Sequence, residues 1–418
     1  MGRAKREIFT GVEIGTATVK VVMAELAEDD ILLVCGLAEE PLPLRQVVKG
    51  EIVEAEAVAD HLARACSNAE SMAGRSVDHM FLAVTGAHIR NMNNTGRVRV
   101  NRQDRRITDD DVVAAHENAK NYPLPIGQQM INHWDRRYVV DATREALNPS
   151  GLIGDLVEAE IHVVYGQLNN LMTSSQLVAD LMNRPLSGIF FSGIASGYAV
   201  CSPSEMQRGR LVIDLGAGVT EYAVFHGPGV FHTGQVTVGC QQIVNDLSLG
   251  LDLSYAKCQK ILLRLAEYGS AIMSLDSRRV LDIESLGKSM RQIPFSTIET
   301  IVELRLRELF EVIVDDLRRQ DVLRRLGMGA VVTGGGAEIP AVDRLAQQVL
   351  AMPVALGWPR QVESLHSHPV SPRWATPLGL IRLGAFALNI EAYQPSFREM
   401  LKADWKNFSG LLTRAFRW

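Results

Sequence analysis

Short apolar runs alternate along most of the chain with stretches whose apolar residues recur at helical spacing. The runs Ile31–Cys35 and Met80–Val84 predict buried strands, whereas residues 55–72 show the spacing of a helix packed on one face. Later runs at 188–191 and 330–332 predict further strands. Strands that alternate with helices are typical of sheets covered by helices, so we expect an α/β fold.

Residues 86–165 break this pattern and predict a compact α+β insertion with a small core of its own. Thr108 stands before three aspartates, which predicts a helix N-cap and an acidic first turn for a helix ending near Lys120. Residues 97–100, 138–140 and 159–165 predict strands. After the insertion, a helix to about Met182 and the start of a helix between two lobes at 193–200 are expected, and residues 241–320 are mostly helical by periodicity.

Three glycine turns lie far apart in the chain. They contain Gly15-Thr16, Gly216-Ala217-Gly218 and Gly334-Gly335-Gly336, and each follows an apolar, β-branched run. The first two are followed by another such run, which predicts a strand, a tight turn and a strand. Glycine permits positive φ there and lets backbone amides approach an anion, while the third turn leads through Pro340 into a helix-like stretch.

A single short glycine run is usually an ordinary hairpin. All three in this order are typical of the two-lobed, actin-like ATP-binding fold, and the two similar hairpins suggest a duplicated lobe.

Composition limits the alternatives. A chain of 418 residues is too long for one core, and 47% hydrophobic with 22% charged residues is ordinary for a globular protein. The net charge of −5 argues against a general nucleic-acid binder. Five scattered cysteines without a C-x-x-C pair indicate reduced thiols in a cytosol. No apolar run reaches the ~18 residues of a membrane span.

The sequence resembles the FtsA family of actin-like bacterial cell-division proteins over nearly its whole length. Gly11–Thr16 is similar to the family's first phosphate hairpin, and 49–53 also match. The most diagnostic part is the insertion, where Thr85–Ile89 and Asn148–Gly154, followed by Glu158 and His162, resemble the family. Gly193–Tyr198 also resembles the family's inter-lobe segment. Sugar kinases and Hsp70 chaperones share the hairpins but lack the insertion.

The resemblance implies an actin-like two-lobed ATPase fold with an FtsA-type α+β insertion. Its parts are subdomain 1A (1–85 plus 166–204), the insertion subdomain 1C (86–165), subdomain 2A (205–240 plus 321–390), subdomain 2B (241–320), a linker (391–402) and an amphipathic helix (403–418).

The resemblance also implies a site for ATP and Mg²⁺. The residues expected around the phosphates are Gly15, Thr16, Gly216, Gly218 and Thr220, with Asp214 near Mg²⁺ through water. Gly334, Gly335 and Gly336 are expected to line the adenosine side, and Lys260 fits a lysine of the family.

Four positions depart from the family's pattern: Ala217 replaces a glycine, Val219 a hydroxyl residue, Glu221 an aspartate, and Lys257 a glutamate that faces the nucleoside. One lost hydrogen bond changes affinity several-fold. No residue stands out as a base for an attacking water. We therefore expect weak ATP binding and at most slow hydrolysis, although the changes at 217 and 219 could be mild packing differences.

The C-terminal end predicts an amphipathic helix. Its apolar face holds Trp405, Phe408, Leu411, Leu412 and Phe416, its other face holds Lys406, Arg414 and Arg417, and Trp418 ends the chain. Aromatic residues on one side and cations on the other favour a helix lying among lipid headgroups on the cytoplasmic side of the membrane. A helix docked on its own domain or on a neighbour would show the same apolar face.

The family's partners follow from the resemblance. FtsA proteins tether filaments of the tubulin-like FtsZ, whose C-terminal tail is expected to bind within 241–320, and Arg305 is the position we would test. Other expected partners are further copies of the chain, anionic lipid at the division site and other division proteins, with no nucleic acid. The alternatives are a sugar or acid kinase of the same superfamily and the FtsA-like adaptor of type IV pili.

Overall fold

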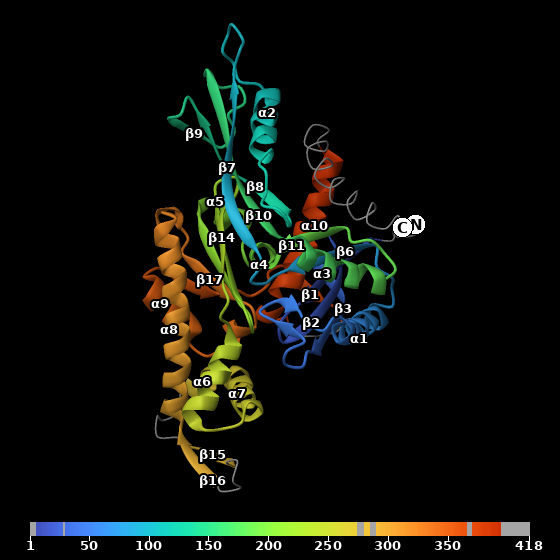
Figure 1. The fold of residues 1–418 in the computed structure, drawn as a ribbon, viewed down its shortest axis with the longest axis vertical. Helices are drawn as coiled ribbons and strands as arrows, with labels where there is room; N and C mark the ends of the chain where they lie inside the picture. Colours follow the sequence, from blue (N-terminus) through green and yellow to red (C-terminus); the bar gives the residue numbers. More distant parts are fainter. Residues whose placement is uncertain (1–5, 28–29, 274–279, 285–289, 366–369, 394–418) are drawn as a thin grey trace.

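Two sheets with the same strand order form the body of the molecule. The computed structural model describes residues 6–27, 30–273, 280–284, 290–365 and 370–393. The first sheet has the order β19-β3-β2-β1-β6-β11, and the second has the order β14-β13-β12-β17-β18 (Figure 1). Without its edge strand β19, the first sheet matches the second strand by strand. In each, an antiparallel hairpin is followed by parallel strands. This repetition confirms the duplicated lobe that the hairpins suggest.

The strands of the first sheet are β1 (Ile8–Ile14), β2 (Thr18–Leu26), β3 (Leu32–Pro41), β6 (His79–Val84), β11 (Gly188–Phe191) and β19 (Val362–Ser364). Those of the second are β12 (Arg210–Leu215), β13 (Thr220–His226), β14 (Gly229–Val236), β17 (Ala330–Thr333) and β18 (Val354–Leu356). The two short strands β4 (Val47–Val48) and β5 (Glu51–Ile52) pair with each other.

Helices cover these sheets and enclose two large cores. They are α1 (Ala55–Ala73), α3 (Leu168–Leu181), α4 (Ser192–Val200), α5 (Pro203–Arg208), α6 (Cys240–Leu251), α7 (Tyr255–Met273), α8 (Phe295–Arg319), α9 (Val342–Leu350) and α10 (Ala375–Tyr393). The first core lies around β1, β2 and β6, and the second combines β12, β13 and β17 with the inner faces of α6 and α8. Because each apolar stripe faces its sheet, the helical spacing of the sequence locates the helices well.

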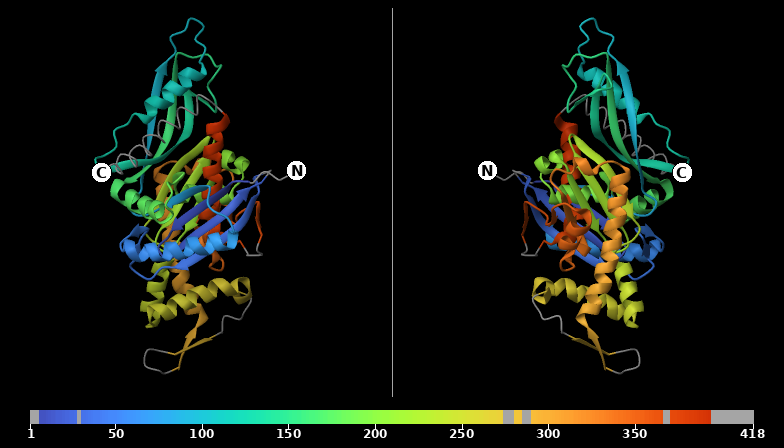
Figure 2. Two further views of the ribbon diagram at one scale, coloured as in Figure 1. Left: turned by 90° about the vertical axis from the view of Figure 1, so that its right-hand side faces the viewer. Right: turned by 90° about the vertical axis from the view of Figure 1, so that its left-hand side faces the viewer.

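The insertion forms one end of the molecule, beyond the two sheets (Figures 1 and 2). Its sheet has the order β7-β10-β8-β9, with α2 (Asp109–Lys120) packed on it. The strands are β7 (Arg90–Arg99), β8 (Gln128–Val140), β9 (Arg144–Ala146) and β10 (Leu156–Gln167). The predicted cap is confirmed, because the Thr108 amide donates to the Asp111 carboxylate over 2.9 Å.

The strands of the insertion are longer than predicted. The first half of β8 carries polar and charged residues that an apolar-run criterion misses, although its pairing with β10 covers them. At the other end of the molecule, β15 (Val280–Glu284) and β16 (Met290–Pro294) form a hairpin within the segment predicted as mostly helical (Figure 1).

The last described segment returns to the first sheet. Although the sequence groups 321–390 with the second lobe, β19 pairs with β3 and α10 packs on β1 and α4. A Cβ at Gly379 would lie 1.7 Å from the Ala195 carbonyl oxygen, so glycine is needed where α10 meets α4. Helix α10 continues to Tyr393, into the predicted linker, because the sequence has no Gly or Pro between 385 and 393.

Candidate nucleotide site between two hairpins

The two glycine hairpins have the same register. In the first, Glu13 pairs with Lys20 and the Gly15 amide donates to the Thr18 carbonyl over 2.9 Å. In the second, Asp214 pairs with Glu221 and the Gly216 amide donates to the Val219 carbonyl over 3.1 Å. Each turn therefore places an acidic residue two positions before its first glycine and a second ionisable residue directly across the ladder.

The hairpin glycines serve close approach rather than positive φ. Gly15, Gly216 and Gly218 do not have positive φ, contrary to the general role expected of turn glycines. A Cβ at Gly218 would instead lie 2.5 Å from the Thr16 hydroxyl oxygen, so the two hairpins touch at this point. Glycine is required there because the two turns meet without room for a side chain.

Four turn amides are available to an anion. The amides of Gly15 and Gly216 close the turns, whereas those of Thr16, Ala17, Ala217 and Gly218 donate to no group in the part of the chain that the structure describes. Backbone amides gathered in facing turns form a concave anion site. This geometry fits a phosphate chain between the two lobes.

The two threonines predicted at the phosphates have structural partners. The Thr16 hydroxyl accepts from the Gly50 amide over 3.1 Å, which joins the matching segment at 49–53 to the first hairpin. Thr220 is fully buried, and its hydroxyl donates to the Val238 carbonyl over 2.8 Å. Thr220 therefore supports the second hairpin rather than facing the gap between hairpins.

The first hairpin carries an ion pair. The Lys20 ammonium lies 3.1 Å from the Glu13 carboxylate, and both side chains are largely buried. Burial acts to lower the pKa of Lys20, but Glu13, Glu39 and Asp214 outweigh it and raise the pKa above its usual value. Lys20 therefore stays charged and neutralises Glu13.

The second hairpin carries two acids instead. Asp214 accepts from the Thr376 hydroxyl over 2.7 Å, and burial raises the pKa of Asp214 against the lowering effects of Thr376 and Lys20. Across the ladder, Glu221 is 5% exposed, and burial raises its pKa to about 8. Its oxygens receive hydrogen bonds from Thr85, over 2.7 Å, and from Ser192.

Glu221 thus joins the second hairpin to two elements of the first lobe, the end of β6 and the start of α4. The sequence marks Glu221 only as a replacement for the family's aspartate. Its structural role could have been suspected because it is an acidic residue in a strand that is buried from Thr220 to Phe225.

The three glycines of the third turn have different surroundings. Gly334 has φ of 82°, and a Cβ there would lie 2.2 Å from the Asp214 Oδ1. A Cβ at Gly336 would lie 2.3 Å from Leu215 Cγ, whereas one at Gly335 would meet nothing within 4 Å. Gly334 and Gly336 are thus needed for packing against β12, and Gly335 is the one of the three at which a side chain would meet open space.

The remaining predicted residues near the nucleotide lie on helices. Lys260 is exposed on α7, one turn beyond Lys257.

The first amides of α6 already have hydrogen-bond acceptors, because Cys240 and Gln241 donate to the carbonyls of Gly216 and Ala217 over 3.0 and 2.8 Å. Helix α6 therefore braces the second turn. Among the described residues, no three His, Cys, Asp or Glu side chains form a ready-made metal centre.

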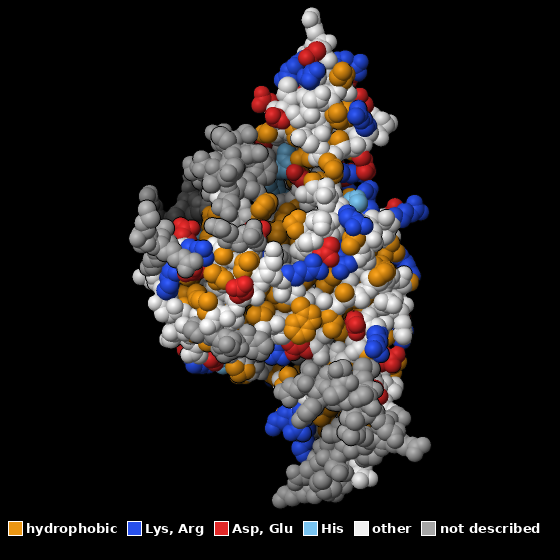
Figure 3. Space-filling view, turned by 180° about the vertical axis from the view of Figure 1, so that it is seen from behind, with side chains coloured by type: hydrophobic (Ala, Val, Ile, Leu, Met, Phe, Trp, Pro, Cys, Tyr) orange, Lys and Arg blue, Asp and Glu red, His pale blue; other side chains and the backbone are white. Residues whose placement is uncertain are grey.

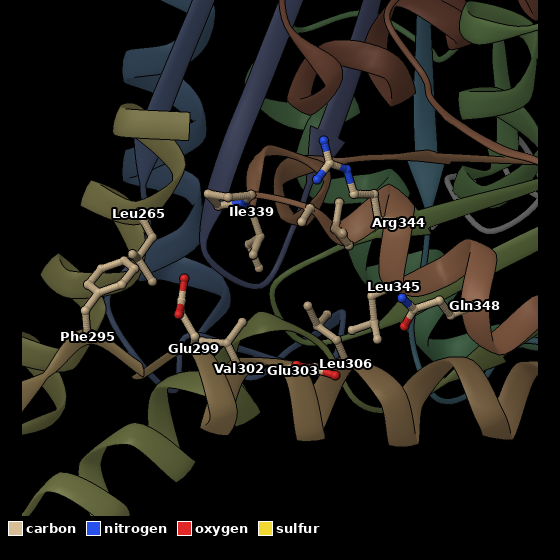
Figure 4. Close-up of a pocket in the computed structure, with 13 residues that line it drawn as sticks. Leu265, Phe295, Glu299, Val302, Glu303, Leu306, Ile339, Arg344, Leu345 and Gln348 are labelled. Carbon is tan, nitrogen blue, oxygen red and sulfur yellow. The ribbon is translucent and has the colours of Figure 1, made fainter. Parts of the chain in front are cut away.

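A cavity of about 340 Å³ lies beside the third turn, between α7, α8 and α9 (Figure 4). Leu265 and Phe295 stand on one side, Ile339 and Leu345 on the other, and Val302 and Leu306 rise from α8. Polar atoms come from Glu299, Glu303, Arg344 and Gln348 at its margin. The size and apolar lining are those of a small-ligand or side-chain pocket.

Arg305 lies on the opposite side of α8 from this cavity. Its guanidinium binds Asp246 on α6 through two hydrogen bonds of 2.6 and 3.0 Å and also contacts Glu308. A hollow of about 300 Å³ adjoins the pair and includes Leu249 and Leu304, which are 84% and 60% exposed. An exposed apolar surface with a fixed cation at its edge suits a protein partner.

The predicted C-terminal helix lies outside the described residues. This applies to Trp405, Lys406, Phe408, Leu411, Leu412, Arg414, Phe416, Arg417 and Trp418. Within the described ranges, no helix combines the length and apolar character needed to cross a bilayer. The face in Figure 3 mixes side chains of both charges with hydrophobic ones over the central body.

Two matching sheets, paired glycine hairpins and the helices α4 and α10 define an actin-like, two-lobed ATPase fold. Solved structures agree: "PilM-PilN type IV pilus biogenesis complex" matches with a TM-score of 0.61 at 14% identity, over 91% of this chain and 99% of that one. MreB5 of Spiroplasma citri bound to ADP matches with a TM-score of 0.52 at 14% identity, over 92% and 98% of the two chains.

The chain belongs to the FtsA family of cell-division proteins. The family model "Cell division protein FtsA" matches residues 211–379, and "SHS2 domain inserted in FTSA" matches residues 86–165. The FtsA of Pseudomonas aeruginosa is 28% identical over 90% of this chain and 89% of its own length. That of Neisseria meningitidis serogroup B is 26% identical over 97% and 96%.

Proposed function

We propose that this protein is an ATP-binding cell-division scaffold that assembles on the inner face of the cytoplasmic membrane at the division site and tethers FtsZ filaments. The supporting observation is the contact of two glycine hairpins with four turn amides that donate to no described group, in a chain of the FtsA family. The division into the subdomains given above is part of the proposal, except that β19 and α10 are grouped with the first lobe because they pack on its sheet.

The residues present suit a magnesium nucleotide. The amides of Thr16, Ala17, Ala217 and Gly218 would hold the phosphates, and Gly335 leaves open space on the nucleoside side. Asp214 would bind the water shell of Mg²⁺. Lys260 would contribute from α7. The methyl group at 217 and the missing hydroxyl at 219 favour weak binding and at most slow hydrolysis.

Calorimetry with Mg-ATP tests this part. We expect binding weaker than micromolar and little phosphate release. Gly335→Val should weaken binding at least tenfold and leave the melting temperature unchanged, because the new side chain enters open space rather than the protein. Sub-micromolar binding with rapid turnover would contradict the expectation, and unchanged binding by the Gly335 variant would place the nucleoside elsewhere.

We infer that the FtsZ tail binds at the Arg305 hollow. Reversing the charge at Arg305 also breaks its pair with Asp246, so Leu249→Ser is the sharper variant because Leu249 is exposed and outside the ion pair. Both variants should weaken tail-peptide binding about tenfold in fluorescence anisotropy. Arg344→Glu, at the cavity on the other side of α8, is the matched comparison. Loss of binding in that variant alone would move the site to the cavity of Figure 4.

The C-terminal helix at 403–418 would provide the membrane anchor. One short amphipathic helix binds lipid reversibly, so firm attachment needs several copies joined in a polymer. A chain that ends at Lys402 should no longer float with anionic liposomes. If it floats like the full chain, the anchor lies elsewhere.

Self-assembly, to which we expect the insertion to contribute, is tested by electron microscopy on a lipid monolayer with ATP. Filaments or sheets are expected from the full chain, and isolated particles under all nucleotide conditions would contradict a scaffold.

Two other functions receive less support. A sugar or acid kinase requires a catalytic carboxylate in a substrate cleft and does not require a basic amphipathic tail. A pilus adaptor shares the fold, as the solved PilM complex illustrates, but the family match and the insertion favour the division protein.

A further inference from the structure

A third cavity, which is polar and has a volume of about 180 Å³, lies where the insertion meets the second lobe. The insertion contributes Arg136 and Arg137 from β8 and Glu145 from β9. The second lobe contributes His226, at the turn between β13 and β14, and Arg325, at the end of the 3-10 helix η2 (Leu323–Arg325). In Figure 1, the lower ends of β8 and β10 run beside β14, which places this junction on the edge of the second sheet.

The arginines of this cavity are fixed in position. The guanidinium carbons of Arg136 and Arg325 lie 3.9 and 4.3 Å from the centre of the Phe231 ring, and the Arg136 Nε donates to the Phe231 carbonyl over 3.0 Å. Stacked guanidiniums lose little conformational freedom on binding. The cavity therefore holds positive charge in a preformed arrangement.

The acids nearby leave part of this charge uncompensated. Glu160 binds both Arg136 and Arg137, and Glu145 binds Arg137 over 2.6 Å but Arg325 only over 3.4 Å. Three guanidiniums thus share two carboxylates. Arg325 has no shorter hydrogen bond in the described part of the chain, and the His226 Nδ1 is buried without a partner. Arg325 and His226 of the second lobe therefore keep hydrogen-bonding capacity beside the arginines of the insertion, and all of them line one small space.

We propose that this cavity is a binding site for a phosphate group, either inorganic phosphate or a small phosphate monoester. The donors come from both the insertion and the second lobe, and arginine forks match phosphate oxygens. The volume is below that of drug-sized pockets, which suits a phosphoryl group with a short substituent. A bound phosphate would link the insertion to the second lobe through Arg136 on one side and Arg325 with His226 on the other.

The site is separate from the proposed nucleotide site and shares none of its residues. Its test uses the full chain with excess ADP, so that the hairpins are occupied, and calorimetric titration with sodium phosphate or glycerol 3-phosphate at constant ionic strength. Arg325→Gln should weaken binding about tenfold, the effect of losing one charge-assisted hydrogen bond. Arg324→Gln is the matched control, because Arg324 is exposed on the same short helix and does not line the cavity.

The two probes distinguish the source of the phosphate. Equal binding of both assigns the site to free phosphate, and tighter binding of glycerol 3-phosphate assigns it to a phosphorylated metabolite or lipid headgroup. Binding that is absent for both probes, or that falls equally in the two arginine variants, overturns the proposal. If Arg325→Gln does not fold, His226→Gln serves instead and should weaken binding several-fold.

Discussion

The two hairpins share a register and a turn but neutralise their acids in different ways. In the first, Lys20 provides a positive charge across the ladder from Glu13. In the second, the corresponding position holds Glu221, which remains protonated at neutral pH because burial raises its pKa to about 8. The same hairpin geometry thus holds an acid opposite a cation in the first hairpin and an acid opposite a neutral carboxyl in the second.

The hairpins also differ in their support. The second is braced by Gly334, Thr376 and the first turn of α6, whereas the first contacts the Gly50 amide. This difference teaches that a local motif fixes the position of the backbone, while its charge state and rigidity depend on what packs around it. Four predictions test this comparison, in decreasing order of effect.

Lys20→Met should give the largest effect. The substitution leaves Glu13 buried without its cation, and losing one partner of a buried pair costs about 3–5 kcal/mol of unfolding free energy. Chemical denaturation at pH 7 measures it. Glu221→Gln is the matched change in the other hairpin and should not destabilise the protein at pH 7, because glutamine mimics the protonated acid in the folded state and cannot ionise in the unfolded chain. Equal losses would show that the hairpins do not differ in charge compensation.

Gly334→Ala should lower the unfolding free energy by about 2–4 kcal/mol, from strain at positive φ and overpacking against Asp214. Gly335→Ala, one residue later, should change it by no more than about 0.5 kcal/mol because its Cβ enters open space. Thermal and chemical unfolding of the two variants side by side provides the measurement. Similar losses would contradict the unequal packing of this turn.

Glu221→Gln should also change the pH dependence of stability. In the unfolded chain the carboxyl ionises above its ordinary pKa of 4.5, while in the folded protein it keeps its proton up to about pH 8. The folded state therefore binds more protons in this window, and stability falls as pH rises through it, by about 1.4 kcal/mol per pH unit for one group. The variant should lose this part of the slope between pH 4.5 and 8. Parallel curves for both proteins would mean that Glu221 ionises normally.

Ala217→Gly should give the smallest effect. Removing the methyl group lets the turn approach a phosphate more closely, and we expect Mg-ATP to bind a few-fold tighter. Gly218→Ala should act in the opposite direction, because its Cβ would press on Thr16 and separate the hairpins. Calorimetry on both variants is the measurement, and tighter binding by the Gly218 variant would contradict the proposed contact of the two turns.

Much of the fold was predictable because its signals are local. The hairpin strands, the cap at Thr108, α1 and α4 follow from apolar spacing and turn residues, and the structure confirms them. The first half of β8 and the hairpin β15–β16 were missed because their residues lack long apolar runs. The return of α10 to the first sheet was missed because a helix pattern does not specify which sheet it covers.

The candidate site was predictable in part. Gly15, Gly216 and Gly218 were identified from the turn pattern, but the free amides belong largely to their neighbours, because Gly15 and Gly216 use theirs to close the turns. Thr220 has the residue type of a phosphate ligand, yet its hydroxyl binds Val238.

The order of the turns, the place of the insertion and the family can be read from the chain, since these depend on residues adjacent in it. The protonated state of Glu221 emerges only in the folded protein, as does the finding that Gly335 is the one glycine of the third turn with open space beside it. Folding also brings Arg136 and Arg325 together on one ring. Each of these properties depends on burial and on neighbours far away in sequence, such as Thr85 and Ser192 around Glu221. Electrostatic and steric environments are set by distance in space, which the chain acquires only on folding.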